Sequence, residues 1–238
     1  MTPASLKTDF ARLWYLASAA EFARRKDFAE LEVHLEHARQ TVPNDPEILL
    51  ASGWVHESFA APASQAAARQ RSSIAVGTRN AHLRRAEGYF RDALARNPEL
   101  AEARLRLGRV LGLQNRHEDA LVELLRALEL AEDRTQSYYA LLFLGRSEEA
   151  LGRLEAARRR FERASALYPI AQSPRLALSR LAVERGDEQA AQRVLDEAID
   201  PPGAHADGDP WWVYDLGPGR YAERARLPLH LALHEEPR

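Results

Sequence analysis

The 238-residue sequence predicts an all-α repeat protein, because one pattern of residues recurs along most of the chain. Ala93 and Ala127 are 34 residues apart, and so are Ala164 and Ala198. A fixed period of this length indicates a unit that stacks on copies of itself to bury its apolar face. Repeat proteins of this kind usually bind other molecules, so we expect a binding protein.

The residues around the alanine recur in columns as well. The alanine column is Ala38, Ala93, Ala127, Ala164 and Ala198. Three residues earlier stands a large apolar column of Leu35, Phe90, Leu124, Phe161 and Leu195. A small residue lies further upstream, at Ala19, Gly53, Gly108, Gly145 and Ser179. Five residues after the alanine, three copies have a proline: Pro43, Pro98 and Pro169.

This combination of period and columns resembles the tetratricopeptide repeat over about residues 12–205. The resemblance implies a right-handed α-solenoid of about five helix-turn-helix repeats, each with a helix A and a helix B. The predicted array covers residues 1–205, with copies at 12–45, 46–100, 101–134, 138–171 and 172–205. The first copy has Ser18-Ala19 in place of Leu-Gly, and Glu132 replaces the proline of the third copy.

The columns have a physical meaning in such a repeat. Gly108 and Gly145 on helix A, and the alanines on helix B, mark places where two backbones approach too closely for a large side chain. The Leu and Phe column fills the space between repeats. Proline ends helix B, because it lacks an amide donor and restricts the residue before it.

Composition excludes several classes of protein. The formal net charge of −2 and a pI near 6.5 give no basis for binding nucleic acid or an anionic membrane. The chain has no cysteine, and no run of 18 apolar residues long enough to span a membrane. The N-terminus is unlike a signal peptide, so we expect a cytoplasmic protein. A mature exported or periplasmic protein with an added methionine would look the same.

An insertion at residues 60–80 separates helix A from helix B in the second copy. No acidic residue lies between Glu57 and Glu87, whereas five arginines do: Arg69, Arg71, Arg79, Arg84 and Arg85. One interpretation is a basic protrusion that meets an acidic partner or phosphate. The other, which we favour, is a lengthened helix with a solvated basic face.

Residues 206–238 follow the array and form a predicted C-terminal cap. Asp209-Pro210 predicts a helix start, and Gly217-Pro218-Gly219 predicts a stop. A terminal repeat needs a cover for its last apolar face. We expect the aromatic residues of this segment to supply it, with an aromatic ligand site as the alternative: Trp211, Trp212 and Tyr214.

The sequence contains none of the phosphate-loop, dinucleotide, nucleophile-elbow or zinc-protease motifs, so we expect neither an enzyme nor a cofactor. Histidines form two pairs with helical spacing, His34 with His37 and His230 with His234. Neither pair has the third and fourth ligands that a metal site requires, so we expect no metal.

The resemblance also implies a concave groove lined by helix A. Its fifth position in each repeat is leucine, giving Leu50, Leu105, Leu142 and Leu176, with Leu16 in the first copy. Its ninth position gives Trp54, Arg109, Arg146 and Arg180, after Ala20. Such a surface suits a peptide with apolar anchors and carboxylates. Alternatively, the leucines belong to the packing surface between helices.

The three arginines differ in the partners that their own helices offer. Arg146 has Glu149 at i+3, and Arg180 has Glu184 at i+4, so both can be neutralised locally. Arg109 has leucines at those offsets, and we expect it, beside Trp54, to contact a ligand. The predicted function is a protein-interaction module or scaffold that binds an acidic protein or peptide partner. The alternative is self-association as a homo-oligomer.

Overall fold

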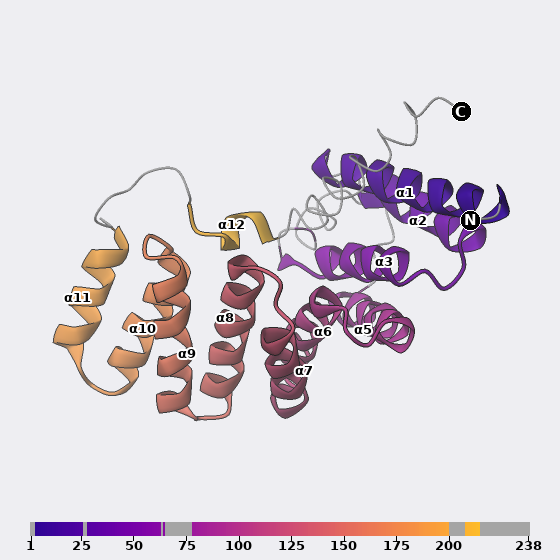
Figure 1. Cartoon of the computed structure of the whole chain (residues 1–238). Helices are drawn as coiled ribbons and strands as arrows, with labels where there is room; N and C mark the ends of the chain where they lie inside the picture. The colour runs from indigo at the N-terminus through magenta and orange to yellow at the C-terminus, as the bar shows by residue number, and fades with distance from the viewer. Residues whose placement is uncertain (1–2, 26–27, 63, 65–77, 200–207, 215–238) are drawn as a thin grey trace. The chain divides into compact units, whose positions relative to one another are not determined.

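The computed structural model describes residues 3–25, 28–62, 64, 78–199 and 208–214. Within these ranges the regular structure is helical, with no strand (Figure 1). The chain divides into two compact units, one holding residues up to Pro98 and the other Glu99–Tyr214. Each unit is a stack of helix pairs.

The first unit contains four described helices. These are α1 (Pro3–Arg24), α2 (Phe28–Thr41), α3 (Pro46–Phe59) and α5 (Arg79–Arg96). Helix α1 pairs with α2, α3 pairs with α5, and α2 packs on α3. Helix α3 begins where a good N-cap meets a proline: the Asp45 carboxylate accepts the amides of Glu47 and Ile48, and Pro46 needs no acceptor.

The second unit contains three helix pairs and a short seventh helix. The pairs are α6 (Ala101–Leu113) with α7 (His117–Glu129), α8 (Arg134–Ala150) with α9 (Leu154–Leu167), and α10 (Gln172–Glu184) with α11 (Glu188–Ile199). They follow one another in chain order, with α7 on α8 and α9 on α10. The short helix is α12 (Trp211–Tyr214), drawn in yellow near α8 in Figure 1.

Two helices start earlier than the predicted copies do. Helix α1 starts at Pro3 rather than near residue 12, and α8 starts at Arg134 rather than 138. Arg84 and Arg85 are exposed on α5. Residues 63 and 65–77 of the insertion, with Arg69 and Arg71, lie outside the described residues.

The turn between helix A and helix B recurs with the repeat. Gly152 and Gly186 adopt φ values of +73° and +76°, and Asn115 stands at the equivalent place with φ 63°. Glycine reaches this left-handed region without a Cβ clash, and asparagine tolerates it. The same backbone conformation therefore closes three successive helix pairs.

The small-residue column is where helix A meets helix B, as predicted. A Cβ added to Gly145 would lie 2.5 Å from the Phe161 ring, and one added to Gly108 would lie 2.5 Å from Leu124 Cγ. Phe161 and Leu124 are fully buried. The large residue of helix B therefore occupies the space that a side chain at the glycine position would need.

Two buried histidines face each other in the first unit. The Nδ1 atoms of His56 on α3 and His82 on α5 are 3.2 Å apart, and Tyr89 stacks on the His56 ring. One Nδ1 must donate and the other accept, so the contact requires at least one uncharged ring. Burial, followed by the charges of His82 and nearby arginines, lowers the pKa of His56 to about 4. Burial and Arg85 also lower the pKa of His82.

We expect Gly145→Ala to destabilise the chain by about 1–3 kcal/mol, because the new methyl group overlaps the Phe161 ring. Gly112→Ala is the matched control in the same unit, since its Cβ would meet only Ser147 Oγ, at 3.5 Å. We expect the control to be neutral or slightly stabilising, because alanine favours a helix over glycine. Urea unfolding measures both variants. Equal free energies of unfolding would contradict the close contact between Gly145 and Phe161.

The free energy of unfolding should fall as the pH drops from about 6.5 to 4. The folded chain keeps His56 uncharged in this range, whereas the unfolded chain binds a proton, so the unfolded state gains protons and stability rises with pH. The loss should be on the order of 2 kcal/mol and should level off below the folded pKa. Urea unfolding at several pH values measures it. His56→Phe should flatten the profile, whereas replacement of the exposed His37 by Gln should preserve it.

Candidate functional site: the helix A face of the second unit

Helices α6, α8 and α10 are the three helices A of the second unit, and each places an arginine at the same repeat position. These are Arg109, Arg146 and Arg180. Their charges act on one another, because Arg109 and Arg180 are among the neighbours that lower the pKa of Arg146. The sequence therefore located a cluster of positive charge.

Arg180 is neutralised, but by a different carboxylate from the one that helical spacing suggested. Its Nε and Nη2 atoms donate to the two oxygens of Glu149, at 2.8 and 2.5 Å. This bidentate bond raises the pKa of Arg180, with Glu184 contributing through its charge. The expected pairing of Arg146 with Glu149 is therefore wrong, because Glu149 reaches the next repeat.

Arg146 lies against an aromatic ring. Its guanidinium stands 4.8 Å from the centre of the Trp211 ring. In the part of the chain that the structure describes, no carboxylate lies within ion-pair distance of it. Surrounding protein atoms and the two neighbouring arginines lower its pKa, although part of the side chain remains exposed. A carboxylate brought to this place would relieve the repulsion.

Arg109, which we expected to contact a ligand, contacts three aromatic rings. Its guanidinium lies 4.4 Å from the Tyr214 ring, 5.2 Å from Trp211 and 5.6 Å from Phe143. Cation–π contacts of this kind contribute about 0.5–2 kcal/mol each. Two of the three rings belong to α12, so the chain's own C-terminal segment occupies the arginine face.

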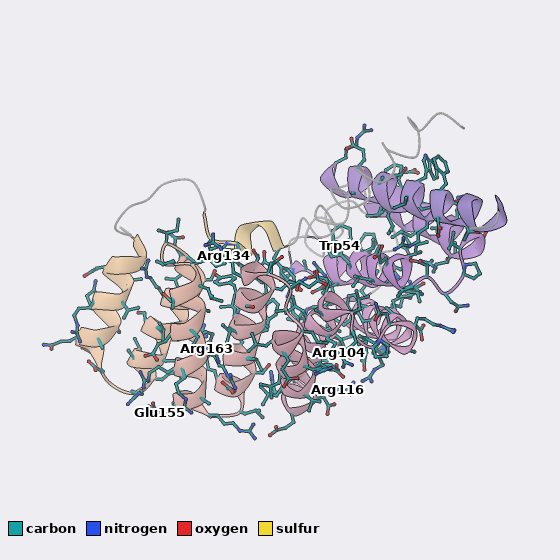
Figure 2. The ribbon with its side chains drawn as sticks, viewed as in Figure 1. Trp54, Arg104, Arg116, Arg134, Glu155 and Arg163 are labelled. Atoms are coloured by element: carbon teal, nitrogen blue, oxygen red, sulfur yellow. The ribbon has the colours of Figure 1, made fainter. Side chains whose placement is uncertain are left out.

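The leucines and tryptophan that we expected in the groove are mostly buried. Leu50, Trp54, Leu105 and Leu142 are each at most 2% exposed, so their side chains do not reach a ligand at the surface. Trp54 lies within the first unit, on α3 (Figure 2). Leu176 on α10 differs, with 48% exposure. Burial of Leu50, Leu105 and Leu142 favours the alternative role of the leucines, which is packing between helices.

The segment from Asp209 to Tyr214, here called the C-terminal segment, is held through a buried carboxylate. Asp209 is 5% exposed, and it accepts hydrogen bonds from the Tyr138 hydroxyl at 2.6 Å and the Ser173 amide at 2.7 Å. Its first oxygen also accepts the amide of Trp211 at 2.9 Å, which starts α12 as predicted. Burial and this carboxylate raise the pKa of Tyr138 well above its ordinary value, so the hydroxyl stays a donor.

The same carboxylate completes the N-terminus of α10. The N-cap residue of α10, Ala171, has no side chain that can accept from the first-turn amides. Asp209 supplies the missing acceptor at Ser173 from 36 residues away. Helix N-termini attract negative charge, because their first amides lack partners within the helix.

Trp211 and Tyr214 of the C-terminal segment pack on α6 and α8. Tyr214 is 2% exposed, and its ring meets Tyr139 at 4.8 Å and Phe143 at 5.3 Å in edge-on geometry. The Arg106 guanidinium, paired with Glu102, lies 4.7 Å from the centre of the Tyr214 ring. The Tyr139 hydroxyl donates to the Pro210 carbonyl at 2.5 Å. Contacts with α6, α8 and α10 thus hold this segment.

The cap predicted for the last repeat is therefore corrected in the described residues. Trp211 and Tyr214 contact α6 and α8, not the outer face of α11. The side chain of Trp212 and residues 215–238, with the predicted stop at 217–219, lie outside the described residues. Sequence reasoning missed Tyr138, Tyr139 and Phe143; two adjacent tyrosines followed by a phenylalanine on helix A were the available signal.

His34 and the other potential metal ligands were considered for a metal site. His34 lies among the rings of Trp14, Tyr15 and Phe22, with its Nε2 3.1 Å from the Tyr15 carbonyl oxygen, which is a packing environment. Among the described residues no group of three or more potential metal ligands converges. None of the described helices combines the length and the apolar character needed to cross a membrane.

Comparison with known proteins gives matches at the level of structure. No protein-family model and no curated protein sequence matches the chain. MamA from Desulfovibrio magneticus RS-1 aligns with a TM-score of 0.63 and 20% identity, over 82% of this chain and 98% of that one. PilF of Pseudomonas aeruginosa aligns with a TM-score of 0.64 and 19% identity, over 95% of this chain and 89% of that one. The chain has the tetratricopeptide-repeat fold. The predicted all-α solenoid is thereby confirmed.

Asp209→Ala should lower the free energy of unfolding by about 1–3 kcal/mol, because it leaves the buried Tyr138 hydroxyl and the Ser173 amide without their acceptor. Hydrogen exchange should show a loss of protection at Ser173. Asp196→Ala, which removes an exposed carboxylate of α11, is the control and should change stability by less than about 0.5 kcal/mol. Equal effects of the two substitutions would contradict the role of Asp209.

Proposed function

We propose that this protein is a non-catalytic interaction module that binds a polypeptide segment of a partner on the helix A face of α6, α8 and α10. One observation carries the proposal: a segment of the chain itself lies on this face, held by side chains of α6 and α8 and by a backbone amide of α10. A surface that accepts one short polypeptide has the donors, aromatic rings and charges to accept another.

Four of the predicted site residues remain in this proposal: Arg109, Arg146, Arg180 and Leu176. Arg146 has no carboxylate at ion-pair distance among the described residues, and the charge of Glu149 offsets only part of the effect of burial and of the two neighbouring arginines, so Arg146 supplies attraction for an acidic group. Leu176 offers apolar surface on the neighbouring helix. Arg180 is held by Glu149 and sets the edge of the face. The partner that fits is an acidic polypeptide with large apolar side chains.

Fold and site support this function in different ways. The tetratricopeptide fold supports a protein-interaction or scaffold role. The arginine cluster and the seated segment support the finer statement, that a peptide binds on helix A. The described residues of α6, α8 and α10 that contact the C-terminal segment bind its aromatic rings and its carboxylate. They do not form a pair of nucleophile and base.

Self-association is the second candidate, and a pair of exposed aromatic residues favours it. Phe10 and Trp14 lie four residues apart on α1, so they share one helix face, and they are 41% and 47% exposed. An apolar face at the terminal helix of a repeat array is a place where another copy can stack. The leucines first considered for such a contact are buried, apart from Leu176.

Selection from random twelve-residue peptides tests the binding function. Peptides retained by the wild type, or by a variant with a weakened C-terminal segment, should bind Arg146→Glu about tenfold more weakly, because the substitution reverses a charge on the face. Arg163→Glu is the control, since Arg163 projects from α9 and is exposed (Figure 2). It should bind as the wild type does.

Two outcomes would count against the proposal. Peptides that bind both variants equally would place the interaction elsewhere on the chain. Failure to retain any peptide, together with a dimer or larger species in light scattering of the same samples, would favour self-association.

A further inference from the structure

The C-terminal segment has the features of a ligand. It consists of Asp209, Pro210 and the four-residue helix Trp211–Tyr214. A helix of this length is too short to be stable by itself in water. The partners that hold it belong to α6, α8 and α10. Its conformation therefore depends on the face beneath it, as that of a bound peptide does.

We propose that the segment Asp209–Tyr214 is a built-in competitor for this face, and that the partner displacing it carries the same chemistry: a carboxylate followed two and five residues later by aromatic side chains. The inference rests on the proposed function, and it names the class of polypeptide that the site takes. It also makes binding conditional on release of the chain's own segment.

The carboxylate position follows from two converging donors. The Tyr138 hydroxyl and the Ser173 amide both point at Asp209, at 2.6 and 2.7 Å. If the segment leaves, water takes the place of the acceptor; a ligand that covers the two donors again without an acceptor leaves each of them unsatisfied, at a cost of about 1–3 kcal/mol. The site therefore selects for an acidic group here.

The aromatic positions follow from rings and cations that enclose them. Tyr214 is enclosed by Tyr139, Phe143 and the guanidiniums of Arg106 and Arg109. Trp211 lies within cation–π distance of Arg109 and Arg146, with the Phe143 ring edge-on. Aromatic side chains suit such positions, because the ring gains contact with cations and with other rings. An aliphatic side chain would lose the cation–π part of the interaction.

The charge of the vacated face favours an acidic competitor over a neutral one. Arg109 and Arg146 lie against the rings of the segment, and burial, followed by the charge of Arg109, lowers the pKa of Arg146. Arg106 and Arg180 are paired with Glu102 and Glu149, so they add less. A partner with acidic residues near the aromatic ones would be attracted by this charge.

Tethering sets how strongly the segment competes. Eight residues, 200–207, join α11 to Gly208. A segment on the same chain competes at an effective concentration on the order of millimolar, so the external peptide binds only the fraction of molecules in which the face is vacant. We therefore expect the wild type to bind the matching peptide at least about tenfold more weakly than a chain with a disabled segment.

The test uses a labelled peptide of residues 206–217, ADGDPWWVYDLG, and the full-length chain. Fluorescence anisotropy should show weak binding to the wild type and at least tenfold tighter binding to Trp211→Ala/Tyr214→Ala. Adding Arg109→Glu to the double variant should abolish the gain, whereas adding Arg163→Glu should preserve it. A peptide with alanine at the positions of Asp209, Trp211 and Tyr214 should not bind. Circular dichroism verifies that each variant is folded, and Asp209→Ala replaces the double variant if that one unfolds.

The outcomes separate this inference from the proposed function. A folded variant that gains no affinity for the peptide would show that the segment is only a structural brace. Random peptides that bind the helix A face through another pattern would support the proposed function and overturn this inference. A wild-type dimer that the peptide dissociates would identify a second copy as the occupant, and would overturn the intramolecular competition.

Discussion

The close contact between a glycine of helix A and a large side chain of helix B determines most of this structure. At Gly145 and Phe161, as at Gly108 and Leu124, a single added carbon atom would overlap the facing side chain. The contact fixes how each helix pair closes, and the pair must then stack on its neighbours to bury its remaining apolar surface. One face of α6, α8 and α10 remains, on which a polypeptide can lie.

Much of the fold could be predicted, because its determinants are local and repeated. The spacing of Ala93, Ala127, Ala164 and Ala198 reports a period that each repeat must keep in order to stack on the next. The left-handed turns at Asn115, Gly152 and Gly186 follow the same spacing. Helix limits were less predictable, since α1 and α8 extend beyond the columns that define the repeats.

The candidate site was predictable only in part. The sequence predicted that Arg109, Arg146 and Arg180 share a repeat position, and their charges act on one another in the structure, because this placement depends on position within a helix. What each arginine contacts depends on residues in other repeats, and helical spacing contains no information about these. Glu149 binds the arginine of the next repeat, and Trp211 and Tyr214 return from beyond the array. Leu50, Leu105 and Leu142 are buried because the fifth position packs against neighbouring helices in these repeats, whereas Leu176 is exposed.

The stability of a repeat array is ordinarily a sum of terms from each unit and its immediate neighbours, so the last units fray first. Asp209 departs from this rule: its carboxylate joins α8 to the first turn of α10, while the rings that follow it rest on α6. Opening of the terminal helix pair is thereby linked to the state of a helix two repeats away. A partner that takes the place of the C-terminal segment without this link would change the cooperativity of unfolding, and the array would pass from one cooperative block toward independently opening units.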